Sequence, residues 1–293
     1  MAVSAAYIGV ILIWSTTPLA IQWSGSEPGF LFGITGRIVL SAILALGLVH
    51  LLRLPIPWDV KARQSYLAAG LGIFFSMLPV YWAAQQIPSG WISVLFGLAP
   101  LVTGAMAPLW LKEKSLSFMQ LIGILFGILG LSIIFSGNLE MGDDAVYGIG
   151  AVLFSVFCYA ISGIWIKRIR STANGLVMTS GGLSVAAPLF LLAWFISGNT
   201  WPETIAPRAI SAIVYLAVFG SLLGFALYYH LLKSMTVTRV ALITLITPIC
   251  ALLLGAELNN EAISPSVWGG TSLILTGLIC FEFGDKWLLK EKA

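Results

Sequence analysis

Long runs of apolar residues alternate along this chain with short breaks of glycine, proline or charged residues. About 20 apolar residues in a helix cross the hydrocarbon core of a bilayer. The pattern therefore predicts an all-α integral membrane protein with ten transmembrane helices, whose bounds are set to within a few residues. The predicted spans are residues 3–24, 29–52, 65–86, 90–111, 116–136, 145–167, 174–197, 208–230, 238–256 and 264–284.

Most breaks between these spans carry charge or turn residues, as in the segments 24–29 and 112–114. The break at residues 87–90, Ile-Pro-Ser-Gly, carries no charge. Nine or eleven spans therefore remain alternatives to ten.

The composition excludes a water-soluble fold. Hydrophobic residues make up 59% of the 293 residues and charged residues only 9%, and the mean hydropathy is +0.98. Soluble domains carry about 25% charged residues, enough to cover their surface. The partner of most of this chain must be a lipid bilayer. The net charge of +3 does not indicate nucleic acid, because the basic residues form short clusters between apolar runs.

The positions of the basic residues predict the orientation. Of the fifteen lysines and arginines, all except Arg37 and Arg208 fall in the loops and tail on one side of the membrane when the N-terminus is placed on that side. Basic loops are retained in the cytoplasm. We therefore expect a multi-pass protein of the cell inner membrane with both termini in the cytoplasm.

The two halves of the sequence resemble each other. Tyr81 lies nineteen residues before Pro100, and Tyr229 lies nineteen residues before Pro248. Each half contains five predicted helices, so the second half enters the membrane in the opposite direction, as in the inverted repeats of transporters. The predicted units are a first five-helix repeat at residues 1–137, a second inverted repeat at 145–285 and a cytoplasmic basic tail at 286–293.

Further spacings recur after the two prolines. A glutamate follows each proline by thirteen residues, and two glycines seven residues apart come next; these residues are Glu113, Gly123 and Gly130 in the first half and Glu261, Gly270 and Gly277 in the second. With Arg37 in the second helix, this order resembles the drug/metabolite transporter superfamily, specifically the EamA-type carriers. The resemblance covers nearly the whole chain. It implies export of amino acids, related metabolites or drugs through a central cavity, and it leaves the substrate open.

Arg37 is the only charged residue well inside a predicted span. It lies about eight residues into its helix, or about 12 Å along the axis. Charges at such depth usually face a bundle interior or a watery cavity. One interpretation is an anchor for a carboxylate or other anion, which the planar guanidinium suits. The other is a structural arginine bonded to carbonyl groups of a neighbouring helix.

Other candidates for the cavity are aromatic, hydroxyl and amide side chains within the spans. Trp82 and Gln85 are favoured over Tyr229, which lies near a helix end and equally fits an aromatic belt at the membrane interface. His230 is either a titrating group or a hydrogen-bonded structural one. The predicted substrate-binding residues are Arg37, Trp14, Thr17, Tyr81, Trp82, Gln85, Tyr229, His230, Thr244 and Thr247.

Pro100 and Pro248 occupy equivalent places in the two halves. Proline interrupts the backbone hydrogen bonds of a helix. We expect both residues to kink their helices beside the cavity and to act as pivots. The GxxxG patterns that begin at Gly123 and Gly220 favour close helix packing within a monomer, with a homodimer as the alternative.

The sequence therefore predicts a secondary transporter for a small-molecule substrate, without a cofactor, a metal site or catalytic residues. The three cysteines all lie in apolar runs, and only two histidines are present. A multidrug or toxic-compound efflux carrier of the same fold is the first alternative, and an intramembrane enzyme or a scaffold are alternatives of other classes. No HExxH or GxSxG motif supports the enzyme.

Overall fold

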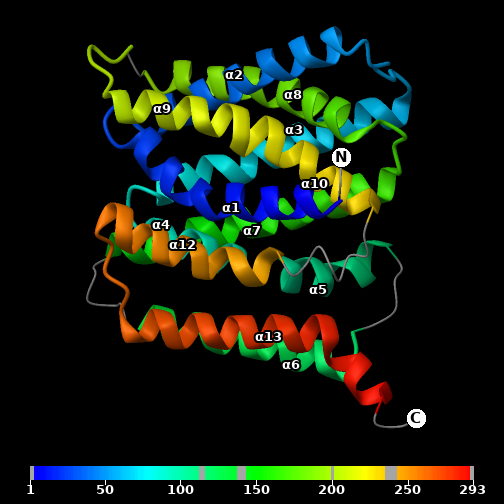
Figure 1. Ribbon diagram of the computed structural model, residues 1–293, viewed down its shortest axis with the longest axis vertical. Helices are drawn as coiled ribbons and strands as arrows, with labels where there is room; N and C mark the ends of the chain where they lie inside the picture. The colour runs from blue at the N-terminus through cyan, green and yellow to red at the C-terminus, as the bar shows by residue number, and fades with distance from the viewer. Residues whose placement is uncertain (1–2, 112–115, 137–142, 199–200, 235–242, 291–293) are drawn as a thin grey trace.

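The computed structural model describes residues 3–111, 116–136, 143–198, 201–234 and 243–290, and within them all regular structure is helical (Figure 1). A chain surrounded by lipid must satisfy its backbone polar groups internally, and helices do so within each segment. The helices are α1 (Val3–Gly25), α2 (Phe30–Leu51), α3 (Val60–Ala83), α4 (Ser89–Phe96), α5 (Ala99–Leu111), α6 (Phe118–Ser136), α7 (Asp143–Ile169), α8 (Gly175–Ile196), α9 (Pro207–Tyr215), the π-helix η2 (Leu216–Leu223), α10 (Gly224–Ser234), α12 (Ile243–Asn259) and α13 (Pro265–Lys290).

The ten-helix membrane fold is confirmed. Eight spans in the described residues are long and apolar enough to cross a membrane, and two shorter apolar helices lie in α6 and α12. The fourth span consists of α4 and α5, and the eighth runs through α9, η2 and α10.

The helix ends differ from the predicted bounds at two places in particular. The third span begins at Val60 instead of residue 65, because the Asp59 carboxylate accepts a hydrogen bond from the backbone N–H of Lys61 and caps a first turn that lies outside the apolar run. The basic tail predicted from residue 286 begins inside α13, which continues to Lys290.

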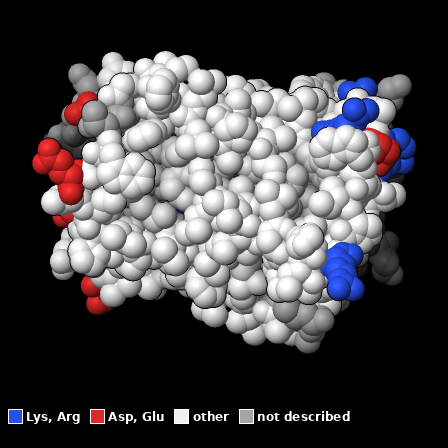
Figure 2. Space-filling model, turned by 90° about the horizontal axis from the view of Figure 1, so that it is seen from above, with Lys and Arg blue, Asp and Glu red and all other residues white. Residues whose placement is uncertain are grey.

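Charged side chains gather at the two ends of the bundle, and Figure 2 shows most acidic side chains at one end and the basic ones, with an acidic one among them, at the other. We call these the acidic end and the basic end. Glu27 follows the end of α1, whereas Asp144 lies at the start of α7 and Lys167 near its end. The first helix of the first half therefore runs toward the acidic end, and the first helix of the second half runs away from it. The two halves are inserted in opposite directions.

The two halves pack against each other, and the main contacts made by helices of one half recur with the equivalent helices of the other half. Helix α3 packs on α7 of the other half, and α1 packs correspondingly on α9 and α10. Helix α1 also packs on α12, and α7 packs on α5. Three equivalent pairs, α2 with α8, α4 with α12 and α6 with α13, meet each other directly. The space between the halves therefore has walls from both.

Helices α6 and α13 lie side by side at one edge of the bundle (Figure 1) and meet through glycines. A Cβ atom added to Gly130 would lie 2.6 Å from the carbonyl oxygen of Gly270, and one on Gly123 would lie 2.6 Å from that of Gly277. These separations are shorter than any Cβ contact tolerates, so only glycine lets the backbones approach this closely. The repeated glycines of the sequence thus pack against each other within one chain.

Replacing Gly270 with alanine should destabilise the protein, whereas the same change at Gly269 should not. A Cβ on Gly270 would lie 2.5 Å from the Gly130 carbonyl oxygen, while one on Gly269 would have its nearest neighbour at 4.0 Å. Overpacking of this kind costs about 1–3 kcal/mol. Thermal unfolding of the purified variants in detergent measures the difference, and equal unfolding temperatures would contradict the close packing of α6 and α13.

Candidate functional site

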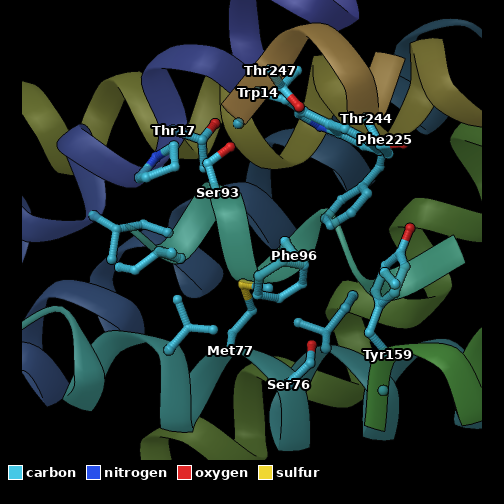
Figure 3. Close-up of a pocket in the computed structure, with 18 of the residues that line it drawn as sticks. Trp14, Thr17, Ser76, Met77, Ser93, Phe96, Tyr159, Phe225, Thr244 and Thr247 are labelled. Atoms are coloured by element: carbon cyan, nitrogen blue, oxygen red, sulfur yellow. The ribbon is translucent and has the colours of Figure 1, made fainter. Parts of the chain in front are cut away.

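A cavity of about 180 Å³ lies between the two halves (Figure 3). Its walls come from α1, α3, α4 and α5 on one side of the sequence and from α7, η2, α10 and α12 on the other, with one side chain from α2. The largest side chains in this lining are aromatic, and most of the polar ones carry a hydroxyl group. The rings are Trp14, Phe96, Tyr159 and Phe225, and the hydroxyl groups outside the rings include Thr17, Ser76, Ser93, Thr244 and Thr247.

Figure 3 shows how these side chains surround the cavity. Thr17 and Ser93 lie together in one upper part of the view, and Thr247 and Thr244 lie beside Trp14 in another. Met77 and Phe96 occupy the centre. Such a mixture of apolar surface and a few placed polar groups is typical of binding sites for small molecules.

Arg37 is the only charged residue among those that line the cavity within the described chain. Its side chain is 2% exposed. Its Nε donates a hydrogen bond to Oγ of Ser221 at 2.9 Å, and its Nη1 donates to the hydroxyl of Tyr81 at 3.4 Å. The guanidinium carbon also lies 5.9 Å from the centre of the Tyr81 ring. In the part of the chain that the structure describes, no carboxylate forms an ion pair with Arg37.

The π-helix η2 supplies the partner of Arg37. A π-turn is wider than an α-turn and is frequent at functional sites. Ser221 lies in η2, and Oγ of Ser41 bridges α2 to the same segment, because it contacts the carbonyl oxygens of both Arg37, at 2.6 Å, and Ala217, at 3.2 Å. The segment Leu-Ala-Val-Phe-Gly-Ser-Leu-Leu resembles an ordinary apolar helix, so its residues carry no signal for this widening.

Five of the predicted substrate-binding residues meet at this cavity, although they come from three helices far apart in the sequence. They are Trp14 and Thr17 of α1, Arg37 of α2, and Thr244 and Thr247 of α12. The sequence offered Thr17, Thr244 and Thr247 as hydroxyl groups within predicted spans, and all three line this one space.

Trp82 and Gln85, the residues that the sequence favoured, are not among the residues that line this cavity. Helix α3 turns Ile73, Ser76 and Val80 toward the cavity. Trp82, two residues after Val80, lies off this face, and Gln85 lies beyond the end of the helix. Trp82 is 37% exposed and borders a separate outer hollow, and Gln85 is exposed after the end of α3.

The remaining aromatic and histidine candidates lie around the cavity, outside its lining. Tyr81 is fully buried beneath Arg37. His230 lies in α10, and its buried Nε2 has no hydrogen-bond partner in the described structure. The Tyr229 side chain lies outside the described residues, while the ring of Tyr228 lies 5.0 Å from that of Trp14.

The two repeated prolines have different local settings. The fourth span is already broken between α4 and α5, and Pro100 is the second residue of α5, where its missing N–H costs no helix bond. Pro248 lies inside α12. Its Cγ would lie 3.7 Å from a Cβ placed on Gly97, so it packs against the break between α4 and α5 beside the cavity.

The sequence reasoning missed several lining residues. No motif marks these residues, because a helix that is apolar on most faces does not show which face is inward. They are Ser93, Phe96, Tyr159 and Phe225. Gly220 was recognised only as part of a packing pattern, and the structure places it against the cavity.

Hydrogen bonds join three helices, α1, α4 and α12, at the acidic end of the bundle. Asn259, the last residue of α12, accepts a hydrogen bond from Nε1 of Trp23 at 3.0 Å and donates to Gln22 at 2.8 Å and to Glu261 at 3.0 Å. The other carboxylate oxygen of Glu261 accepts from the backbone N–H of Gly90 at 3.2 Å, in the first turn of α4. We call these five residues the acidic-end network.

Arg208 at the start of α9 extends this network. Its guanidinium carbon lies 3.9 Å from the centre of the Trp23 ring, and its Nη2 donates to the carbonyl oxygen of Leu258 at 3.4 Å. The ends of α1, α4, α9 and α12 are thus held together at the acidic end, and α1, α4 and α12 also line the cavity.

Comparison with known proteins agrees with this architecture. The model of the EamA-like transporter family matches residues 2–136 and 146–282, one match in each half. The chain is similar to the "Uncharacterized transporter YvbV" of Bacillus subtilis strain 168, with 24% identity over 92% of this chain and 88% of that protein. It is also similar to the "Probable amino-acid metabolite efflux pump" of Escherichia coli strain K12, with 25% identity over 95% of this chain and 94% of that protein.

A solved structure titled "Crystal structure of protein" has the same fold. Its TM-score is 0.66 at 19% sequence identity, and the match covers 95% of this chain and 96% of that one. The likeness at this identity concerns the arrangement of helices.

Ser221→Ala should destabilise the protein by about 1–3 kcal/mol, because it removes the acceptor for a buried, charged N–H of Arg37. Ser132→Ala is the matched control, since the Ser132 hydroxyl bonds the Ile128 carbonyl of its own helix on an exposed face. Thermal unfolding in detergent compares the two. A Ser221 variant as stable as the control would show that Ser221 does not hold the guanidinium.

Proposed function

Because the chain belongs to the EamA-like transporter family, we propose that it is a secondary carrier that exports small metabolites, with amino acids as the favoured class. The observation that carries the proposal is the single charge of Arg37 at a cavity otherwise lined by rings, aliphatic groups and hydroxyls. The name of the Escherichia coli relative, which matches over nearly the whole chain, supports the same substrate class.

The charge of the cavity favours a ligand that carries an anionic group. Burial in a medium of low dielectric makes an uncompensated charge costly, and the attraction to an opposite charge is stronger there than in water. A carboxylate also matches the planar donor geometry of a guanidinium. The rings of Trp14 and Phe225 offer apolar contact area for the remainder of the molecule.

A structural role for Arg37 is the competing interpretation, since Ser221 and Tyr81 already bind it. These two partners engage Nε and Nη1. The Nη2 group has no hydrogen-bond partner in the described structure, and this group remains for a ligand. The two roles are compatible, because a guanidinium held by two partners is oriented for a third.

Efflux of cationic drugs is the second candidate. Aromatic rings at the cavity suit a cation. Against it, the described lining contains no acidic residue, and the charge of Arg37 repels cations. A substrate that carries an anionic group therefore fits the cavity better.

We place the basic end of the bundle in the cytoplasm, as basic residues flanking membrane helices are retained there. Helix α1 begins at this end, and Figure 1 shows the C-terminal end of α13 on the same side of the bundle. Both termini are then cytoplasmic, and the acidic end faces outward from the cell inner membrane.

Transport requires that the cavity opens to each side in turn, as in other carriers built from inverted repeats. The acidic-end network ties α1, α4 and α12 together beyond the cavity residues Ile21 and Ile92. Opening outward must separate these helix ends. The hydrogen bonds of Glu261 and Asn259 would break in that step and form again when the carrier returns.

Arg37→Gln should abolish ligand binding while the protein remains folded, because glutamine keeps a hydrogen-bonding group in place and removes the charge. A bound amino acid at 100 times its dissociation constant stabilises the wild type by about 2.7 kcal/mol, which a thermal-shift assay detects. Arg63→Ala is the control, since Arg63 is exposed at the basic end of α3. A folded Arg37→Gln variant that keeps the full shift would show that Arg37 is not the anchor.

Glu261→Gln should favour the outward-open state, because it replaces a charge-assisted hydrogen bond to Gly90 with a weaker neutral one. A loss of about 1.5 kcal/mol changes the ratio of the two states roughly tenfold. The readout is labelling of a Ser93→Cys variant, without its native cysteines, by an impermeant maleimide from the acidic side.

Glu257→Gln is the matched control for this experiment. Glu257 lies in the last turn of α12, four residues before Glu261, and is exposed at the same end of the bundle. Labelling should increase in Glu261→Gln and not in Glu257→Gln. An equal labelling rate in the two variants would mean that the acidic-end network does not close the outer side.

A further inference from the structure

Gly220 brings the backbone of η2 close to both Arg37 and Thr17. A Cβ atom added to Gly220 would lie 3.2 Å from Cδ2 of Leu216, 3.4 Å from Nη2 of Arg37 and 3.7 Å from Oγ1 of Thr17. Arg37, Thr17 and Gly220 all line the cavity. The guanidinium of α2 and the hydroxyl of α1 therefore border the same part of the cavity, the space over Gly220, where η2 carries no side chain.

On one side of this space, a ligand meets only hydrogen-bond donors. The guanidinium has five N–H groups and no acceptor. Ser221 engages the N–H of Nε and Tyr81 engages one N–H of Nη1, so the second N–H of Nη1 and both of Nη2 remain. A ligand group placed here must accept hydrogen bonds, and a negative charge on it compensates that of Arg37.

On the other side, a ligand meets acceptors. The Thr17 hydroxyl has a single hydrogen, which it donates to the carbonyl oxygen of Ile13 at 2.7 Å, and its lone pairs remain. Pro18 lacks an N–H and so removes the helix bond that the carbonyl of Trp14 would otherwise accept. Trp14, Thr17 and Pro18 all line the cavity, so this turn of α1 offers acceptors to a donor group of the ligand.

We propose that the space over Gly220 recognises both charged groups of a free α-amino acid, with the carboxylate on Nη2 of Arg37 and the ammonium group on Thr17. An α-amino acid carries a carboxylate, which accepts hydrogen bonds, and an ammonium group, which donates them, on the same carbon. This pair matches the donor Nη2 of Arg37 and the acceptor Oγ1 of Thr17, which border the same space. The ring of Trp14, one turn before Pro18, adds a face for the ammonium group. This inference rests on the proposed function and assigns its specificity to named atoms.

The same arrangement discriminates against related molecules. An N-acylated amino acid loses the positive charge at Thr17, and the corresponding amine loses the acceptor at Arg37. A second carboxylate would face the lone pairs of Thr17. Sites built to hydrogen-bond a group reject analogues that lack it, because the buried partner is left unpaired.

The test measures binding to purified protein by isothermal titration calorimetry. The ligands are the proteinogenic L-amino acids, together with the N-acetyl derivative and the decarboxylated amine of the one that binds most tightly. The wild type should bind the free amino acid at least about tenfold more tightly than either derivative, since each lacks one charged hydrogen-bonding group.

Two variants separate the two contacts. Thr17→Val should lower the affinity for the amino acid about tenfold, because valine removes the acceptor at similar volume. The affinity for the N-acetyl derivative, which is already lower, should not change. Gly220→Ala should lower the affinity for both ligands, since both need Nη2 of Arg37. The controls are Thr276→Val, whose hydroxyl bonds its own helix on an exposed face, and Gly163→Ala, where a Cβ meets no atom within 4 Å.

Equal binding of the amino acid and its N-acetyl derivative to the wild type would overturn this inference and leave the proposed function standing. A folded Thr17→Val variant with wild-type affinity would do the same. Thr17→Ser, which keeps the hydroxyl, should retain the wild-type preference. Binding of none of the amino acids would overturn the proposed function together with this inference.

Discussion

The positive charge of Arg37 lies deep among apolar helices, and much of the surrounding structure serves to hold it there. A charge in this position is tolerated only with hydrogen-bond partners or contact with a polar space. Ser221 and Tyr81 provide the partners, and the cavity provides the space. The π-helix η2 and the Ser41 bridge keep Ser221 within reach, so the wide turn and the buried arginine depend on each other.

The bundle combines a closely packed edge with a centre whose contacts can exchange. Glycines let α6 and α13 meet through their backbones, and this pair lies apart from the cavity walls. The helices around the cavity are instead joined at the acidic end by side-chain hydrogen bonds, which form and break at modest cost. Rearrangement around the cavity is therefore less costly than separation of α6 from α13.

The sequence predicted the fold well, because lipid imposes length and apolarity on every span, and the charged loops set the directions. It selected Arg37, Thr17 and Thr247, which line one cavity, since charges and hydroxyl groups in lipid-embedded helices stand out. It also favoured Trp82, which lies outside this lining, because α3 is apolar on several faces and hydrophobic periodicity does not reveal the inward one. It could not show η2 or the acidic-end network, which depend on contacts between residues far apart in the chain.

The role of Arg37 is tested most directly by a crystal or cryo-EM structure of the protein with a bound amino acid that carries a heavy atom, such as selenomethionine supplied as free ligand. We expect ligand density in the cavity between α1 and η2, with the carboxylate within hydrogen-bond distance of Nη2 of Arg37. Density elsewhere, or a ligand in the cavity whose carboxylate does not contact Arg37, would contradict the role of this buried charge as the substrate anchor.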